Sequence, residues 1–368
     1  MSEIKSIPLE RFHAEKGARF VPFAGWNMPV QYTSIIKEHL AVRNKVGLFD
    51  VSHMGEVILT GNQCEDYLNY LLTNDYSNLE IGCSRYSMMC YEDGGVVDDL
   101  IVYRLEERKY LICVNAGNTD KDFEWMQKQA GDFDITLENR SSDYALLAIQ
   151  GPDSVDFLTP LTTEDLSTIG RFQHVETEIS GVTVILSRTG YTGEEGFEIY
   201  IPAARAEAVA GAIEERANDL QLEDFYSGLG CRDSLRLEAG YPLYGHEISE
   251  VIDPITAGLG WTVKLGKPMD FIGKQALSAI KAAGATRRVK FFYLSDRRIA
   301  RQDEPVWLGE KEVGKVLSGT FSPVIEKAIG SAIIDQEAVA ESGLEVRPRG
   351  NPFALNCVKP PIHHSLSH

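Results

Sequence analysis

The stretch that decides the fold is Gly94-Gly95-Val96-Val97-Asp98-Asp99-Leu100-Ile101-Val102-Tyr103-Arg104-Leu105, which places two adjacent carboxylates inside an apolar, β-branched run. Val, Ile, Leu and Tyr at this density predict a buried or half-buried strand, and the two glycines predict the turn that leads into it. Side chains alternate across a strand, so Asp99 shares a face with Ile101 and Tyr103, while Asp98 lies on the opposite face. Only one of the two aspartates can therefore face a given pocket.

Two interpretations of this aspartate pair remain open at the level of the residues. A buried carboxylate is costly unless it finds donors, a cation or a proton. Both side chains could lie at the mouth of the strand and accept hydrogen bonds from turn amides, which is a structural role. Alternatively, one of them could serve a catalytic site, where carboxylates in apolar surroundings are often found.

The length and charge of the chain limit the class of protein. At 368 residues it exceeds what one hydrophobic core usually supports, so we expect two or three domains of about 100 to 150 residues each. The 54 acidic and 36 basic residues give a net charge of −18, which repels nucleic acid and anionic membrane. A small anionic ligand would need arginines of its own in this acidic background.

The cysteines and the apolar runs indicate a cytoplasmic protein without a metal centre. The six cysteines have neither C-x-x-C spacing nor the density of a disulfide scaffold, so we expect reduced thiols and no structural zinc site. No window approaches the ~18 uninterrupted apolar residues of a membrane span, and the first residues lack the apolar core of a signal peptide.

Hydrophobic periodicity predicts a mixed helix and strand region followed by a separate β domain. The composition shifts near Gly284, and the remainder has short strands divided by turns, as in a small barrel. Ser34 and Thr119 are predicted helix N-caps, and the histidine-rich tail from residue 363 is predicted to be disordered. Before the shift, strands are predicted over 57–60, 84–90, 96–105, 110–115 and 144–150, with helices over 64–72, 118–131, 203–220 and 275–283.

Several polar residues outside the aspartate pair could serve chemistry. Asn115 ends a predicted strand where a cleft could use it, and His53 lies in a polar segment without a second ligand at metal spacing, which favours a structural role. Glu198 lies between apolar neighbours in a predicted strand, where a solvent-facing edge position is the simplest explanation. Arg232 falls in the first turn of a predicted helix, where it opposes the helix dipole and suits a ligand clamp better than a stabilising role.

Taken together, these motifs resemble the aminomethyltransferases, and most closely the T-protein of the glycine cleavage system. The resemblance covers residues 8–360, and although each motif is weak alone, seven in the same order are specific. They are Phe23-Ala24-Gly25-Trp26 with Met28-Pro29-Val30-Gln31-Tyr32, Asp50-Val51-Ser52-His53-Met54-Gly55, Gly94-Gly95-Val96-Val97-Asp98-Asp99-Leu100, Arg188-Thr189-Gly190-Tyr191-Thr192-Gly193-Glu194, Arg232-Asp233-Ser234-Leu235-Arg236-Leu237-Glu238-Ala239-Gly240, Ala257-Gly258-Leu259-Gly260-Trp261 and Ser318-Gly319-Thr320-Phe321-Ser322-Pro323.

The resemblance implies an α+β, three-domain, cloverleaf-like fold. It places two sequence-interleaved, mixed α/β domains in residues 1–283, the second over about 52–140. A C-terminal β-barrel follows over 284–362, and residues 363–368 form a tail. The family transfers the methylene of an aminomethyl group, carried on the dihydrolipoyl arm of the H-protein, to tetrahydrofolate. The products are 5,10-methylenetetrahydrofolate, ammonia and the reduced arm, and no metal takes part.

The resemblance also implies roles for individual residues. Asp99 matches the catalytic aspartate, Glu198 the pterin-binding carboxylate, and Arg232 the arginine near the glutamate tail of the folate. The remaining matches are pocket positions, namely Met54, Asn115, Trp261 and, less closely, Arg288. Family members often end with an aromatic residue near the folate, whereas Pro360-Pro361-Ile362 here leads into a tail without tyrosine, so no C-terminal folate contact is expected.

Residue chemistry supports the same assignments, and two other functions remain as alternatives. A carboxylate such as Glu198 can accept both parallel N–H donors of a reduced pterin, and an arginine suits the carboxylates of a glutamyl tail. Trp261 could stack on the aminobenzoyl ring, although a tryptophan in this setting is more often part of a core. The alternatives are a tetrahydrofolate-dependent demethylase of a small methylated metabolite and a non-catalytic folate-binding protein. The Lys-Gly-Cys signature of the latter class is absent, since Asp270-Phe271-Ile272-Gly273-Lys274-Gln275 stands in its place.

Overall fold

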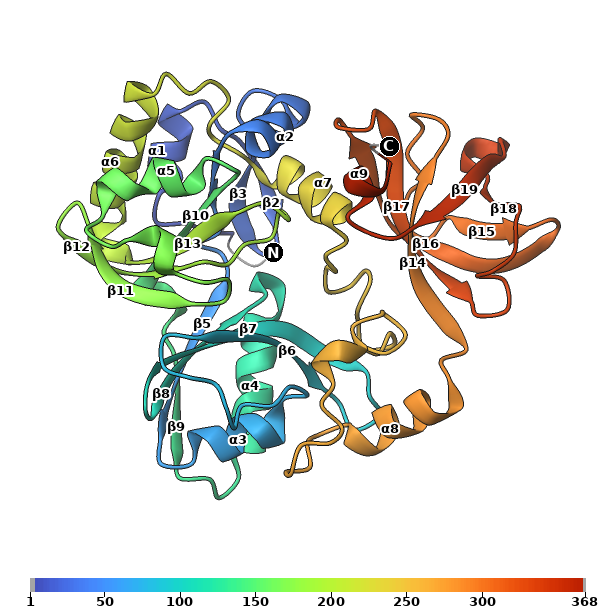
Figure 1. Ribbon diagram of the computed structural model, residues 1–368, viewed down its shortest axis with the longest axis horizontal. Helices are drawn as coiled ribbons and strands as arrows, with labels where there is room; N and C mark the ends of the chain where they lie inside the picture. The colour runs from blue at the N-terminus through green and yellow to red at the C-terminus, as the bar shows by residue number, and fades with distance from the viewer. Residues whose placement is uncertain (1–3, 367–368) are drawn as a thin grey trace. The chain divides into compact units, whose positions relative to one another are not determined.

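A computed structural model describes residues 4–366 of the chain (Figure 1). Its packing divides the chain into two compact units, each made of several segments. Unit 1 consists of Met1–Cys64, Asn78–Arg85 and Leu100–Arg232, and unit 2 of Glu65–Ser77, Tyr86–Asp99 and Asp233–His368.

The largest core of unit 1 lies on an antiparallel sheet of order β11-β12-β13-β10-β4. Apolar side chains of the strands pack with the apolar face of helix α6 (Ala206–Asp219), including Val209 and Ile213. The sheet places β13 in its centre, between β10 and β12. Its strands are β4 (Gly47–Asp50), β10 (Tyr144–Gln150), β11 (His174–Ile179), β12 (Val182–Ser187) and β13 (Gly196–Pro202).

A second five-stranded sheet has the order β6-β7-β8-β5-β9. Along the chain, β6 and β7 each continue from one unit into the other, whereas β5, β8 and β9 belong to unit 1. The register of β5 against β8 sets Glu56 directly opposite Cys113. Its strands are β5 (Gly55–Gly61), β6 (Ser84–Cys90), β7 (Val96–Glu106), β8 (Lys109–Val114) and β9 (Ile135–Asn139).

The remaining elements of unit 1 are a small sheet and short helices. The sheet has the order β1-β3-β2, with a parallel pairing of β1 to β3 and an antiparallel pairing of β2 to β3. The strands are β1 (Lys5–Ser6), β2 (Arg19–Phe23) and β3 (Trp26–Gln31). The α-helices are α1 (Glu10–Glu15), α2 (Ile35–Asn44), α4 (Thr119–Ala130) and α5 (Ser154–Leu158). The 3-10 turns are η1 (Ala116–Asn118), η2 (Ser141–Asp143), η3 (Thr159–Leu161), η4 (Leu166–Thr168) and η5 (Ala203–Arg205).

The C-terminal part of unit 2 is a closed barrel of order β14-β17-β16-β15-β18-β19, as the sequence predicts. Alternating apolar residues of these strands, among them Phe292, Val316 and Ile334, fill its interior. The strands are β14 (Arg287–Leu294), β15 (Pro305–Leu308), β16 (Lys311–Ser322), β17 (Lys327–Asp335), β18 (Leu344–Val346) and β19 (Phe353–Val358), with the 3-10 turn η7 (Pro348–Gly350) before β19.

The rest of unit 2 supports the turn between β6 and β7. Val96 packs with Ile248, Phe271 and Leu277 in a separate apolar cluster, and the backbone N–H of Val96 donates to the carbonyl of Ser249 at 2.9 Å. This cluster holds the start of β7 in place. This part of unit 2 contains α8 (Lys274–Ala283) and the 3-10 turn η6 (Gly260–Thr262), while α3 (Cys64–Leu71) and α7 (Leu229–Ala239) each begin in unit 1 and end in unit 2.

Two local predictions need correction, and one cap is confirmed. Ser34 caps α2 by accepting from the Lys37 N–H at 3.3 Å. Thr119 is the first residue of α4 instead of its cap, because its hydroxyl donates back to the carbonyls of Asn115 and Ala116. The tail is ordered at its start, where helix α9 (Ile362–Ser365) buries Ile362 in an apolar cluster; His368 lies outside the described residues.

Candidate functional site

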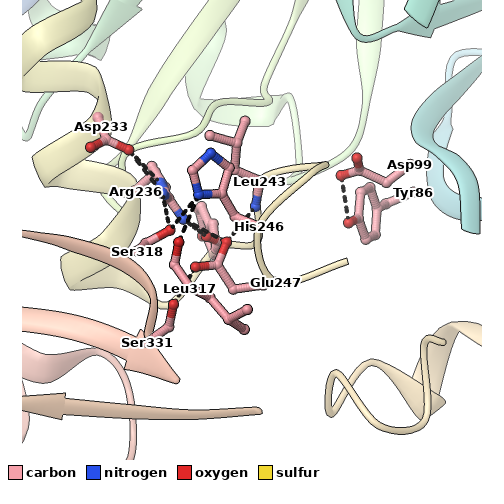
Figure 2. A network of polar contacts seen from close by, with 11 residues as sticks. Tyr86, Asp99, Asp233, Arg236, Leu243, His246, Glu247, Leu317, Ser318 and Ser331 are labelled. Carbon is pink, nitrogen blue, oxygen red and sulfur yellow. Dashed lines mark hydrogen bonds and ion pairs between the residues drawn. The ribbon is translucent and has the colours of Figure 1, made fainter. Parts of the chain in front are cut away.

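The carboxylate of Asp99 is held by a tyrosine on the neighbouring strand. The Tyr86 hydroxyl, from β6, donates to Asp99 Oδ2 at 2.8 Å, and Figure 2 shows the two side chains facing one another. Asp99 is half-buried, whereas Asp98 is fully buried, so the two carboxylates lie in different surroundings. The alternation predicted for this strand is therefore confirmed, and the hydrogen bond fixes the orientation of the Asp99 carboxylate.

Trp261 lies beside the same tyrosine and is not part of a core. The residue is 58% exposed, and its indole stacks on the Tyr86 ring, with 5.9 Å between ring centroids and 29° between planes. The 3-10 turn η6 carries it, and this turn is anchored by the Thr73 hydroxyl, which donates to the carbonyl of Thr262 at 3.2 Å. Asp99, Tyr86 and Trp261 thus form one carboxylate–phenol–indole cluster in unit 2, called here the Asp99 cluster.

A buried ion pair in unit 2 connects α7 to the barrel. Arg236 Nη1 donates to Glu247 Oε2 at 2.8 Å, and its Nη2 donates to the hydroxyl of Ser318 on β16 at 2.9 Å (Figure 2). Glu247 also accepts from Ser331 and from the Leu243 N–H. Burial raises the pKa of Glu247, but the Arg236 charge and these hydrogen bonds outweigh burial, and its pKa lies below the ordinary value of 4.5.

Glu198 is buried in the centre of the first sheet of unit 1. It is only 8% exposed, and its Oε2 accepts a 2.5 Å hydrogen bond from the Thr189 hydroxyl. The explanation of Glu198 as a solvent-facing residue of an edge strand is therefore wrong, because β13 has a partner strand on each side. Thr189 also contacts the Tyr103 hydroxyl at 3.4 Å, so a small polar network surrounds the carboxylate.

Arg232 lies within electrostatic reach of Glu198 in the same unit. Its guanidinium stacks on the ring of Tyr191, with 4.8 Å from Cζ to the ring centroid. Burial lowers the pKa of Arg232, and the nearby Glu198 carboxylate opposes this effect. Its Nη1 is buried and has no hydrogen-bond partner among the residues that the structure describes. Glu198, Thr189, Tyr191 and Arg232 are called here the Glu198 cluster.

The other predicted pocket residues of unit 1 lie at the ends of strands. Met54 precedes β5, and its N–H donates to the Val51 carbonyl in a turn. Asn115 follows β8 and is half-buried at the entrance to η1. A folate contact of Met54 and of Asn115 stays a prediction.

Arg288 differs from the other predicted residues because its guanidinium is used inside unit 2. On β14, its Nη1 donates to the Ile255 carbonyl at 3.0 Å, and its Nε donates to Gln336 Oε1 at 3.0 Å. These contacts join the barrel to the segment before η6. They assign Arg288 a structural role, and a folate contact stays a prediction.

The structure adds residues that the sequence argument did not single out. Tyr86, Thr189 and Tyr191 contact the predicted site residues directly. Thr189 and Tyr191 were within reach of sequence reasoning, since both belong to the quoted Arg188–Glu194 motif. Tyr86 belongs to none of the quoted motifs. Its contact with Asp99 depends on the register of β6 against β7, which the sequence does not give.

The chain is similar to known proteins over nearly its full length. The chain matches the GCVT N-terminal domain over residues 9–267 and the glycine cleavage T-protein C-terminal barrel domain over residues 287–363. It is 49% identical to an aminomethyltransferase of Listeria monocytogenes serotype 4b (strain F2365), with 94% of each chain covered. It is 46% identical to an aminomethyltransferase of Symbiobacterium thermophilum, with 98% of each covered. The crystal structure of glycine cleavage system aminomethyltransferase T from Bartonella henselae superimposes with a TM-score of 0.90, at 34% identity and 98% coverage of both chains.

Proposed function

Because the chain belongs to the glycine cleavage T-protein family and has its α+β fold with a C-terminal barrel, we propose that the Glu198 cluster binds the folate and that the Asp99 cluster serves the chemical step. The chain is an aminomethyltransferase of the glycine cleavage system. The acceptor is tetrahydrofolate, and the donor is the aminomethyl group on the dihydrolipoyl arm of the H-protein. Transfer breaks the carbon–sulfur and carbon–nitrogen bonds of the donor and forms bonds to N5 and N10 of the folate, releasing ammonia and the reduced arm.

The Glu198 cluster is assigned to folate binding. The observation that carries this assignment is a carboxylate buried at a sheet centre with an arginine nearby. Glu198 accepts from the 2-amino and N3 donors of the pterin, and the Thr189 hydroxyl fixes the direction of the carboxylate. Arg232 binds an oxygen of the folate tail, while the Tyr191 ring holds the guanidinium in position. Met54 and Asn115 remain proposed pocket residues.

The Asp99 cluster is assigned to the chemical step. As carbon–nitrogen bonds rearrange, positive charge develops at the transferring carbon and a proton must move from a folate nitrogen as ammonia leaves. An oriented carboxylate can stabilise the charge and accept the proton. Tyr86 orients that carboxylate through its 2.8 Å hydrogen bond, and the exposed Trp261 indole provides an aromatic surface for the aminobenzoyl ring.

Ammonia release from aminomethylated H-protein, measured with and without tetrahydrofolate, tests the proposal. Rapid release that depends on tetrahydrofolate is the expected result. Demethylation of a small thioether or betaine at a comparable rate, with no activity on the carrier protein, would instead establish the demethylase alternative, which the named relatives do not favour. Among residues 4–366, no helix has the length and apolar character needed to cross a membrane, and a cytoplasmic location stays a prediction.

A further inference from the structure

The two aromatic residues of the Asp99 cluster are carried by backbones that one short segment of unit 2 joins. This segment, Leu72–Asn74, is called here the linking segment. On one side, Asn74 Nδ2 donates to the carbonyl of Tyr86 on β6 at 2.9 Å. On another side, the Thr73 hydroxyl donates at 3.2 Å to a carbonyl of η6, the turn that carries Trp261. The linking segment therefore couples the position of Trp261 to that of Tyr86.

A buried lysine binds the linking segment from the stretch that follows η6. Lys267 is 5% exposed, and its Nζ donates to the Leu72 carbonyl at 2.5 Å and to the Asn74 carbonyl at 2.7 Å. Both carbonyls lie just beyond the end of α3, where the helix supplies no donor for them. Nζ also lies over the Phe271 ring, 4.6 Å from its centroid. Lysine is rarely buried unless its amine is paired, so these contacts account for its position.

All three carbonyls of the linking segment accept hydrogen bonds from the stretch after η6. The Lys264 N–H donates to the Thr73 carbonyl at 2.9 Å, between the two carbonyls that Lys267 binds. Tyr86 packs on the apolar cluster that contains Val263, so apolar contacts also connect β6 to this stretch. The aromatic stack of the Asp99 cluster thus rests on one framework, and the side chain of Lys267 supplies two of its hydrogen bonds.

We propose that Lys267 is a positioning residue of the Asp99 cluster, which holds the Trp261 indole against the Tyr86 ring through the linking segment. Because Tyr86 donates to Asp99, the same framework keeps the carboxylate oriented. The catalytic part of this inference rests on the proposed function, whereas the effect on the aromatic stack does not. Catalytic groups lose rate steeply when their supporting residues let them move, so a lysine outside the cluster can control its activity.

The position of the indole is tested first, by fluorescence of the ligand-free enzyme. Lys267→Met keeps the length of the side chain and removes its N–H donors. The Trp261 signal is obtained as the difference between each protein and the same protein carrying Trp261→Phe. In Lys267→Met this signal should move to longer wavelength and be quenched more strongly by acrylamide, because the indole leaves the Tyr86 ring and enters water. Lys267→Arg, which keeps N–H donors, should return both quantities toward the wild-type values.

A second lysine of the same stretch provides the matched control. The side chain of Lys264 is exposed, and its contact with the linking segment is made by the backbone N–H. Lys264→Met removes one lysine side chain, as Lys267→Met does, but keeps that backbone contact. Its Trp261 signal and its kcat/KM should therefore equal those of the wild type.

The next test is kinetic and separates positioning from a general loss of stability. In Lys267→Met, kcat/KM for tetrahydrofolate should fall about 10-fold or more, since small displacements of a catalytic group are costly. In a background of Tyr86→Phe and Trp261→Ala, the same substitution should add no further loss, because the side chains through which it acts are gone. Equal losses in the two backgrounds would overturn the proposal, since Lys267 would then act on the fold alone.

A variant on the other side of the framework serves if Lys267→Met does not fold. Thr73→Val removes the hydroxyl that donates to η6, and it should change the Trp261 signal in the same direction. Wild-type emission and quenching of Trp261 in a folded Lys267→Met, or in Thr73→Val, would overturn the positioning role. If the wild type shows no tetrahydrofolate-dependent ammonia release, the proposed function fails, but the Trp261 signal still decides whether Lys267 positions the stack.

Discussion

Asp98 and Asp99 are adjacent carboxylates whose surroundings predict different consequences of the same substitution. Asp99→Asn keeps the shape of the side chain but removes the charge and the base, so we expect kcat to fall about 100-fold or more while folate still binds. Asp98 is fully buried, and Asp98→Asn should act mainly on folding, by about 1–2 kcal/mol. Steady-state assays and thermal unfolding of the two variants, made side by side, measure both effects. If Asp98→Asn kept its fold and lost more kcat than Asp99→Asn, then Asp98 would be the catalytic residue and Asp99 the structural one.

Glu198 provides a second test at a single residue. Glu198→Gln replaces one acceptor by an N–H donor that faces the donors of the pterin, so binding of reduced folate should weaken by about 1–3 kcal/mol. Isothermal titration with 5-formyltetrahydrofolate measures the change, and Glu195→Gln is a suitable control because that side chain is bonded to Arg188. Unchanged affinity of the Glu198 variant would remove this carboxylate from the binding site.

Glu56 is a buried carboxyl that the proposed reaction does not use. It is 1% exposed, neither oxygen has a partner in the described chain, and burial raises its pKa well above the ordinary 4.5. A raised folded-state pKa means that its contribution to stability is complete below pH 4.5 and declines as pH rises toward the folded value.

Glu56→Gln should therefore be more stable than the wild type at neutral pH. The advantage should grow by up to about 1.4 kcal/mol per pH unit above 4.5 and vanish below it. Denaturant unfolding at a series of pH values from 4 to 8 measures the difference. A difference in stability that stays constant across that range would show that the pKa of Glu56 is the same in the folded and unfolded states.

Among the elements, α7 depends on the buried pair of Arg236 and Glu247, which joins it to β16 and β17 through Ser318 and Ser331. Arg236→Met leaves a buried carboxylate unpaired and should lower the free energy of unfolding by about 3–5 kcal/mol. Arg236→Met combined with Glu247→Leu should lower it by less than the sum of the two single losses. Denaturant unfolding of the single and double variants measures this coupling. Additive losses would show that the pair does not act as a unit.

The same pair predicts the direction of acid sensitivity. The folded-state pKa of Glu247 lies below 4.5, so its stabilisation is present above that value and is lost as pH falls through the folded pKa. Unfolding followed between pH 3 and 6 should show a steeper loss for the wild type than for Glu247→Gln. Parallel curves would place the acid-sensitive group elsewhere.

How far the sequence could predict these elements depends on the range of the interactions involved. Alternation along β7 is a local property, and it separated Asp98 from Asp99 correctly. The position of β13 between two other strands is a property of the whole sheet, and for that reason Glu198 could not be recognised as buried from its neighbours in sequence. Thr119 was misplaced by one residue because its hydroxyl bonds backward to Asn115 instead of capping the helix.

Site geometry was the least predictable, because it brings together residues far apart in sequence. The position of Tyr191 under Arg232 and the binding of Lys267 to the linking segment are tertiary features without a local signal. The motifs of the family supplied several of the residues but not their contacts. The boundaries of the three domains remain predictions, and so do the catalytic role of Asp99 and the folate contacts of Met54, Asn115, Glu198, Arg232, Trp261 and Arg288.

For the molecule as a whole, the net charge of −18 bears on the encounter with a carrier protein. An acidic H-protein would be repelled at long range, and salt screens that repulsion over a Debye length of about 10 Å at 0.1 M. Turnover at sub-saturating carrier should therefore rise as salt increases from low to physiological concentration, with kcat unchanged. The rate at saturating carrier is the control, and a fall in turnover with salt would indicate docking through a local basic patch.

The stacking of Trp261 on Tyr86 also gives this protein an optical reporter of its own. Among the tryptophans of residues 4–366, Trp261 is exposed and the others are half-buried, and its stacking partner Tyr86 donates to the Asp99 carboxylate. Its emission should therefore shift to shorter wavelength when an aromatic ligand shields the indole from water. Stopped-flow fluorescence of the unlabelled enzyme could then follow ligand arrival and departure within single turnovers, with Trp261→Phe as the silent reference.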